Sequence, residues 1–374
     1  MTHTSLLSPP LLFALAGLAA CTAELPDVTT SEQSICGLGC GENGGVIAGV
    51  PFWELHLGGL ANAQGVRLKG FAEDLAHAAN KSYSPLYVDG ARLRGKSSVG
   101  VTLLNQALKN TIMVLGVKPV DKRNETEVYL KITDVSLTSE FQHYWTSGIA
   151  AGGTIETYRF QWAIPDPANP TGHLPFVDMC PNLTAPGEPW TNTVHAIVFE
   201  GDRYTATREI QLSPHGGWFN IACAGGTPAK MHLVRRTSAS SSAGISTTIA
   251  DDRQAFARMW AADYCGDGHS FTETGHKLRI RDRKGWIAAA GPVGYSTLDS
   301  WKLGFTYEAV WRADGAVCLN TPRLADVNPG IKAEIDDRCS IPSCSSQPWF
   351  PANWKLHGDI LSANPAPSPV IVPP

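Results

Sequence analysis

Four side chains that could take part in catalysis or metal binding lie within one short segment: Asp263, Cys265, Asp267 and His269. In a catalytic site, Cys265 would be the nucleophile and His269 its general base. In an oxidising compartment an exposed thiol would be oxidised, and Cys265 would form a disulfide instead. We favour the disulfide and therefore expect this segment to be structural.

Asp263 and Asp267 also follow the start of an EF-hand calcium loop, with Gly268 at its sixth position. However, the third position is Cys265, a poor calcium ligand, and the twelfth is Thr274 instead of a bidentate glutamate. We expect the two aspartates to accept hydrogen bonds from backbone N–H groups of a turn. An irregular cation site between them is the alternative. We predict no metal site and no cofactor, because no metal-binding, nucleophile-elbow or nucleotide-binding motif occurs in a fitting context.

The cysteine content indicates disulfides. The chain has nine cysteines. If Cys21 carries a lipid, eight remain as disulfide candidates: Cys36, Cys40, Cys180, Cys223, Cys265, Cys318, Cys339 and Cys344. An even number in an exported protein is typical of complete pairing, although the connectivity cannot be predicted. The alternative is a metal site at the closely spaced pairs, Cys36 with Cys40 and Cys339 with Cys344, but no histidine lies beside either pair.

The N-terminus predicts export. Residues 11–20 are apolar over a signal-peptide length, too short to span a bilayer, and end in Leu18-Ala19-Ala20-Cys21. This ending resembles a lipoprotein cleavage site, so we expect residues 1–20 to be removed and Cys21 to anchor the chain to a membrane. No Lys or Arg precedes the apolar stretch, which departs from the usual pattern. The alternative is a plain secretory signal. Thr22 follows the anchor, and not an aspartate that would suggest retention in the inner membrane, so we expect delivery to the outer membrane.

Composition and patterning predict a β-rich protein without a nucleic-acid partner. Of 374 residues only 17% are charged, and the net charge is −4, which gives no general attraction to nucleic acid. Apolar and polar residues alternate over 126–132, and β-branched and aromatic residues are concentrated at 194–199 and 217–223. Residues 305–318 predict a hairpin, with a type I′ turn at Asp314-Gly315.

One clear helix is predicted over residues 248–264, and a weaker one over 72–79. Phe256, Met259, Trp260 and Tyr264 share one face of the first, and that apolar stripe should be buried. Gly266 should cap its C-terminal end. The fold class is therefore α+β, predominantly antiparallel β with one clear helix, stapled by disulfides.

The segment Ala262-Asp263-Tyr264-Cys265-Gly266-Asp267-Gly268 resembles the signature of the ADYC-domain family of bacterial secreted proteins and lipoproteins. Two flanking blocks, 219–230 and 307–318, resemble that family too, and the resemblance covers about residues 190–344. It implies cysteines at two positions where this chain has Met231 and Phe256. The simultaneous loss of two cysteines keeps the number even. The resemblance implies no particular activity.

We predict five regions: a signal peptide at 1–20, a tether at 21–45, an N-terminal β-rich region at 46–185, an ADYC-like domain at 186–350 and a Pro-rich tail at 351–374. The tether is polar and Gly-rich, as flexible linkers are. We expect a cell-envelope protein that binds a partner or is structural. A secreted hydrolase with an unidentified active site is the alternative.

Overall fold

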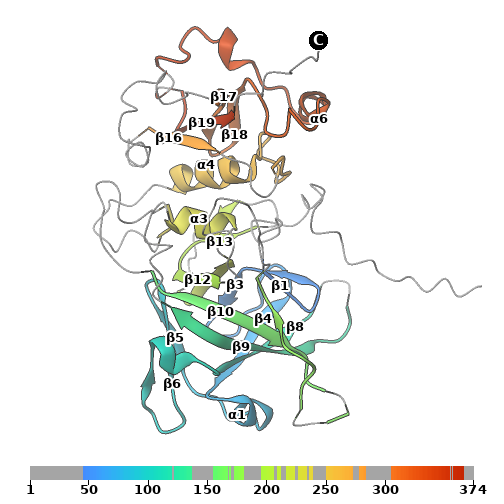
Figure 1. Cartoon of the computed structure of the whole chain (residues 1–374), viewed down its shortest axis with the longest axis vertical. Coiled ribbons are helices and arrows are strands. Elements are labelled where there is room, and N and C mark those ends of the chain that lie inside the picture. The colour runs from blue at the N-terminus through green and yellow to red at the C-terminus, as the bar shows by residue number, and fades with distance from the viewer. Residues whose placement is uncertain are drawn as a thin grey trace, which may run out of the picture.

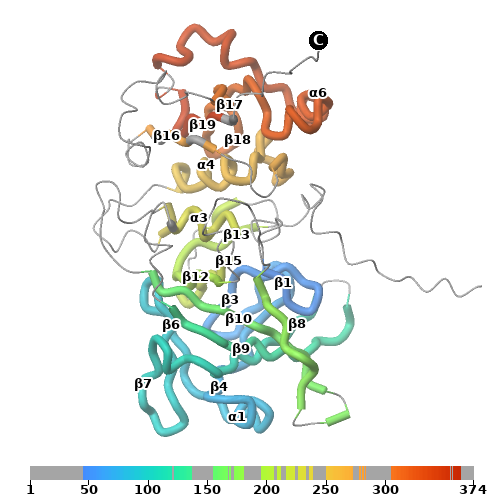
Figure 2. The backbone as a smooth tube through the Cα atoms, viewed as in Figure 1, coloured from blue at the N-terminus to red at the C-terminus, as the bar shows by residue number. Residues whose placement is uncertain are grey.

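The computed structural model describes residues 45–119, 122–136, 155–166, 168–169, 172–180, 195–205, 209–211, 216–223, 226–233, 236–238, 250–272, 278–283, 305–353, 355 and 357–365. They form an N-terminal part on one large sheet and a C-terminal part on a smaller sheet, with helices between them (Figure 1). Figure 2 shows that chain order follows this arrangement, from blue and green strands through yellow helical segments to orange and red.

The large sheet is antiparallel and has eight strands. In spatial order they are β3 (Glu54–His56), β15 (Trp218–Cys223), β12 (His195–Glu200), β10 (Thr157–Ala163), β9 (Thr126–Ser136), β8 (Ile112–Val117) and β4 (Val66–Ala72), with β11 (Val177–Asp178) also paired to β10. The pairing of β3 with β15 brings an early and a late segment of the chain together at one edge of the sheet.

The predicted alternation in residues 126–132 is confirmed by β9. Val128, Leu130 and Ile132 are buried in the main core, and Lys131 is half-buried on the opposite face. Tyr129 shares that opposite face but is also buried, because it packs in a small cluster with residues of α1 (Leu75–Ala79) and β8. The strand therefore contributes to two cores, which a simple two-sided pattern does not predict.

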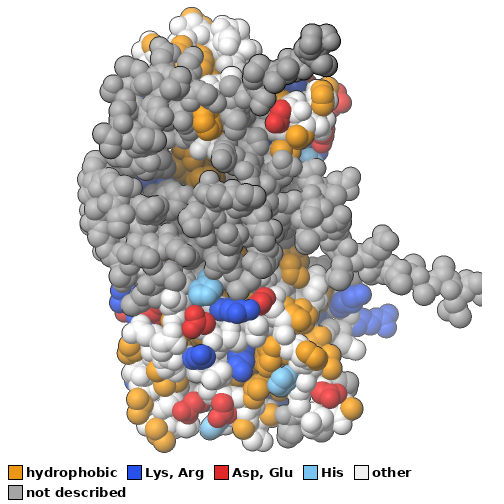
Figure 3. All heavy atoms as spheres, in the orientation of Figure 1, with side chains coloured by type: hydrophobic (Ala, Val, Ile, Leu, Met, Phe, Trp, Pro, Cys, Tyr) orange, Lys and Arg blue, Asp and Glu red, His pale blue; other side chains and the backbone are white. Residues whose placement is uncertain are grey.

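Smaller elements close the N-terminal part. The hairpin β1 (Gly45–Ile47) and β2 (Val50–Phe52) and the three-stranded sheet β5 (Leu86–Asp89), β6 (Arg92–Lys96) and β7 (Thr102–Leu103) contribute to the main core, as does the 3-10 helix η2 (Asn105–Leu108). Charged side chains of both signs lie over the visible face of this part (Figure 3). In the N-terminal part, Arg67 pairs with Glu125 and Arg159 pairs with Asp178. This is the pattern of a solvated sheet face.

The C-terminal part is a four-stranded antiparallel sheet with helices packed against it. The strand order is β16 (Arg279–Asp282), β19 (Ile360–Pro365), β17 (Phe305–Arg312) and β18 (Gly315–Leu319). The other elements are α3 (Thr227–Leu233), α4 (Ala250–Ala261), α6 (Ile331–Arg338), the 3-10 helix η6 (Cys344–Ser346) and the pair β13 (Arg203–Tyr204) and β14 (Ile210–Gln211). A second core forms between these elements.

Helix α4 lies between the two parts and is buried on nearly all sides (Figure 1). Three of its four charged residues, Asp252, Arg253 and Arg258, are each at most 6% exposed. The predicted helix is present, and its apolar stripe packs in the second core, with Trp260 half-buried at the margin of that core. An amphipathic pattern assumes one solvated face, whereas this helix has protein on both sides.

The predicted hairpin at 305–318 is formed by β17 and β18, but its turn differs. Arg312 pairs with Gly315, so the turn residues are Ala313 and Asp314. Neither has a positive φ, while Gly315 does, at 124°. The register also shifts by one residue between Val310 and Trp311. The predicted type I′ turn at Asp314-Gly315 is therefore wrong.

Two of the predicted region boundaries do not match the fold. The boundary between residues 185 and 186 divides the large sheet, because β12 pairs directly with β10. The predicted tail at 351–374 includes β19, which lies inside the four-stranded sheet with Ile360 and Leu361 fully buried. The prediction missed this strand because the region is rich in proline, which is rare inside a sheet. The prolines lie at the last residue of the strand, Pro365, and after it.

Among the described residues the fold is predominantly antiparallel β, with four α-helices and three disulfides. No helix within the described ranges is long and apolar enough to cross a bilayer.

Candidate functional site

The signature segment, residues 262–268, begins where α4 ends. Ala262 has a left-handed φ of 50°, and its N–H donates to Met259 O at 3.1 Å, while the Asp263 N–H donates to Arg258 O at 2.9 Å. These two bonds form a Schellman motif, in which glycine usually occupies the left-handed position. The prediction that Gly266 caps the helix is therefore wrong, because Ala262 adopts that conformation four residues earlier.

Asp263 holds the turn that follows. Its carboxylate is completely buried and accepts hydrogen bonds from Arg258 Nη1 at 2.5 Å and from the Gly268 N–H at 3.0 Å. Asp267 accepts from the His269 N–H at 2.9 Å. Both aspartates bind backbone N–H groups of the turn, which confirms the prediction made from their residue types. The buried pair with Arg258 makes Asp263 unsuitable as a solvent-accessible acid or base.

Tyr264 connects three separate segments. Its hydroxyl donates to Glu308 Oε1 on β17 at 2.7 Å and accepts from the Arg323 N–H at 2.7 Å. Burial raises the pKa of Tyr264 well above its usual value, and the nearby Glu308 raises it further. The phenol is therefore neutral and able to donate. Its ring stacks on Trp311, with centroids 5.1 Å apart.

Arg323 completes this network beneath the end of α4. Its guanidinium is buried, and Nε donates to Glu308 Oε1 at 2.8 Å. The other nitrogens donate to the helix carbonyls of Met259 at 2.5 Å and Trp260 at 3.1 Å. An arginine on terminal carbonyls satisfies groups that otherwise lack partners and interacts favourably with the helix dipole. The network therefore fixes the helix end to the β17–β18 hairpin.

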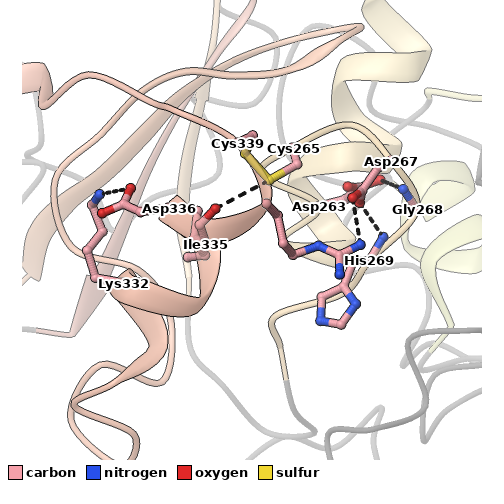
Figure 4. The surroundings of a disulfide bond; sticks show 10 residues. Asp263, Cys265, Asp267, Gly268, His269, Lys332, Ile335, Asp336 and Cys339 are labelled. Carbon is pink, nitrogen blue, oxygen red and sulfur yellow. Dashed lines mark hydrogen bonds and ion pairs between the residues drawn. A yellow bond between two sulfur atoms is a disulfide. The ribbon is translucent and has the colours of Figure 1, made fainter.

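Cys265 bonds to Cys339 at the end of α6 (Figure 4), and the other pairs are Cys180–Cys223 and Cys318–Cys344. Every cysteine among the described residues is thus in a disulfide. Cys21, Cys36 and Cys40 lie outside the described residues. Because Cys265 carries no free thiol, the interpretation of Cys265 as a nucleophile activated by His269 has no chemical basis in this oxidation state.

Gly266 and Gly315 allow the signature segment to touch the hairpin backbone. Gly266 has φ 70°, and a Cβ placed on it would lie 2.0 Å from the carbonyl oxygen of Asp314. A Cβ on Gly315 would lie 2.5 Å from Tyr264 O, and the Ala316 N–H donates to that same oxygen at 2.8 Å. Backbones this close leave no space for side chains.

Asp267 is exposed and His269 is half-buried, and both lie on the loop that follows Cys265 (Figure 4). Asp267 pairs with Arg338 at 2.6 Å, with side chains 40% and 37% exposed. His269 lies 3.6 Å from Glu334 and packs against the ring of Phe271. These contacts are additional links between the signature segment and α6. Within the described ranges, no group of three or more His, Cys, Asp or Glu residues could hold a metal ion.

A second group of interacting polar residues lies on the large sheet. Thr157 Oγ1 is 2.9 Å from His195 Nδ1, and Asp134 is 3.9 Å from His195 Nε2. The three residues come from β10, β12 and β9, and their spacing in the sequence does not predict that they lie close together. A hydroxyl, an imidazole and a carboxylate are the components of nucleophilic catalysis, but Thr157 is completely buried. The structural alternative is that these side chains form a polar cluster that links neighbouring strands.

The sequence interpretation missed Glu308, Arg323 and Arg258, which complete the signature's contacts. Glu308 is a charged residue flanked on both sides by apolar and aromatic residues, and this pattern could have indicated a buried charge. The two positions where the family resemblance implied cysteines, Met231 and Phe256, are both buried in the second core. Apolar side chains fill the space at both.

These contacts define a disulfide-bonded, predominantly β protein whose signature segment joins a buried helix to a sheet and a second helix. A family model described as the ADYC domain matches residues 111–325, and the chain belongs to that family. The match begins well inside the N-terminal part, at Thr111, and ends before α6. Neither the curated proteins nor the solved structures include a match to this chain.

Proposed function

We propose that the chain is an exported lipoprotein, held in the cell envelope by a lipid on Cys21, whose ectodomain binds a partner or is structural and does not catalyse a reaction. Export is supported above all by the pairing of all six described cysteines in disulfides. Such pairing is typical of oxidising compartments and rare in the cytosol.

The architecture of the signature segment supports a structural role. Ala262 ends a helix, Asp263 and Tyr264 are in buried polar contacts, and Cys265 is in a disulfide. Residues committed to such contacts have no side-chain group left for a substrate. The segment is therefore best explained as the joint that gives the ectodomain one fixed shape.

The anchor is tested by the Cys21→Ser variant. Wild-type protein should fractionate with membranes, and its N-terminal peptide should carry acyl chains detectable by mass spectrometry. The variant should be unprocessed or soluble. A Cys36→Ser variant is the matched control and should keep the acyl chains. A processed Cys21→Ser protein that stays in the membrane without lipid would contradict the anchor. Density-gradient separation of the membranes then tests delivery to the outer membrane.

A secreted hydrolase is the second candidate, and the 2.9 Å contact between Thr157 and His195 favours it. If Thr157 were a nucleophile, a fluorophosphonate probe should label wild-type protein and not a Thr157→Ala variant. Labelling that is absent from both proteins, or equal in both, would remove this candidate.

A further inference from the structure

The edge where β3 pairs with β15 joins the two cores. Leu55 of β3 and Phe219 of β15 are buried in the main core, whereas Trp53, just before β3, is buried in the second core. Glu54 lies between them and is 1% exposed, an unusual environment for a carboxyl group. Any change in the charge of Glu54 therefore acts at the junction of the N-terminal and C-terminal parts.

Glu54 lies directly opposite Asn220 in the β3–β15 register. Residues paired in this way have Cβ atoms about 5 Å apart on the same face of the sheet. Asn220 is also 1% exposed, and its amide Nδ2 donates to the carbonyl oxygen of Asp202 at 3.1 Å. That bond sets the orientation of the amide, because the reverse orientation would place two acceptors together.

Among the described residues, two buried oxygens of this pair have no hydrogen-bond partner: Glu54 Oε2 and Asn220 Oδ1. Both are acceptors if Glu54 is ionised, so neither can satisfy the other. A buried acceptor without a donor is unfavourable. A proton on Glu54 Oε2 turns that oxygen into a donor, and the register places Asn220, with its acceptor Oδ1, directly opposite.

The neighbouring charges do not compensate an ionised Glu54 well. Arg203 on β13 is the nearest cation, with Nη2 3.4 Å from Glu54 Oε1, a long contact, and its guanidinium lies over the ring of Trp218. On α4, Arg253 is held by Asp202 at 2.5 and 2.9 Å.

Among the described residues, His56 on β3 and Tyr204 on β13 are further titratable groups near the pair. His56 contacts backbone groups of Gly58 and Gly216 through its two ring nitrogens, and Tyr204 is buried beside Glu54. Burial, only partly offset by Arg203 and by the Tyr204 N–H, raises the pKa of Glu54 to about 7.

We propose that Glu54 and Asn220 form a proton-binding pair, in which a protonated Glu54 donates Oε2–H to Asn220 Oδ1 and makes the junction between the two parts sensitive to pH. The proton is taken from solvent, and its loss leaves a buried carboxylate beside an unpaired amide oxygen. The folded protein binds this proton more tightly than the unfolded chain. The pair therefore stabilises the fold fully below pH about 4.5, and this contribution is lost as the pH rises through about 7.

The first test is a carbon-13 NMR titration of the Glu54 carboxyl group in the full mature wild-type chain, assigned through the backbone. The expected midpoint is near 7, and a midpoint near 4.5 overturns the proposal. An Asn220→Ala variant separates the pair from simple burial. Loss of the acceptor should lower the Glu54 midpoint, and an unchanged midpoint overturns the role of Asn220.

The second test measures urea unfolding at about pH 5 and about pH 8. Glu54→Gln keeps the shape of the protonated acid and supplies a permanent N–H donor to Asn220. Relative to this variant, wild type should lose roughly two orders of magnitude in its folding constant between the two pH values. Glu209→Gln, at an exposed position, is the matched control and should keep the wild-type pH dependence. Equal pH dependence in wild type and Glu54→Gln overturns the proposal. If a variant fails to fold, the NMR titration of the wild-type protein decides the outcome.

Discussion

The hydroxyl of Tyr264 lies 2.7 Å from Glu308 Oε1, and both residues are buried beneath the end of α4. This contact joins the signature segment to the central strands of the C-terminal sheet. It also explains why a tyrosine, and not a phenylalanine, suits the position, since the hydroxyl donates to Glu308 and accepts from the Arg323 N–H.

Tyr264→Phe should therefore destabilise the protein by about 2–4 kcal/mol, because it leaves two buried polar groups with one partner fewer. Urea unfolding measures this difference. Tyr204→Phe is the matched control, because Tyr204 is buried in the same core and its hydroxyl has no hydrogen-bond partner within the described part of the chain. Its cost should be within about 0.5 kcal/mol of zero. Similar costs for the two variants would contradict the importance of the Tyr264 network.

Gly266→Ala should be strongly destabilising, by about 2–5 kcal/mol, because it combines a left-handed φ with a direct clash against Asp314 O. Gly100→Ala provides the control, since Gly100 has a similar φ of 83° but nothing within 4 Å of the added Cβ. That variant should lose only about 1–2 kcal/mol. Thermal unfolding of the two proteins separates backbone strain from close packing, and equal losses would show that the packing contributes nothing.

Removal of the Cys265–Cys339 disulfide by a double alanine substitution should cost about 2–5 kcal/mol. The Cys318–Cys344 pair is the comparison, because its sequence separation is 26 against 74 for the first pair. In the chain-entropy account the shorter loop should cost about 1 kcal/mol less. Alkylation of denatured, non-reduced protein should label none of these four cysteines, and labelled cysteines would contradict the pairing.

A fragment limited to the matched residues, 111–325, should not fold cooperatively. It lacks β3 and β4, which pair with β15 and β8, and the partners Cys339 and Cys344 of two disulfides. A fragment of residues 45–365 should unfold in one sharp thermal transition. A sharp transition from 111–325 alone would show that the outer strands and α6 are dispensable.

Local patterns predicted the elements better than the contacts between them. Alternation located β9, and residue composition located β12, β15 and the β17–β18 hairpin. The end of α4 was missed because Ala262 has a left-handed φ, a conformation that glycine usually adopts at a helix end. The hairpin turn was misplaced because residue type favours glycine inside a type I′ turn, whereas Gly315 is the first residue of β18.

The contacts of the signature segment depend on residues distant in the chain. Asp263 could be assigned to a turn from its type alone, but its buried partner Arg258 could not. Arg323 comes from a loop without a regular pattern, and its bonds to helix carbonyls follow only from the packing of α4 against the sheet. Disulfide connectivity has the same origin, since eight cysteines are compatible with many pairings.

The pairing of β3 with β15 has a consequence for the order in which the protein can mature. Residues 54–56 are synthesised early, but their partners 218–220 follow only after more than a hundred further residues. Contacts of such long sequence separation form slowly. Two of the disulfides also require residues 339 and 344, close to the end of the described chain. The N-terminal segment must therefore remain soluble with an unpaired strand edge until residues 218–220 are available, and during that interval a chaperone that shields strand edges would have its greatest effect on yield.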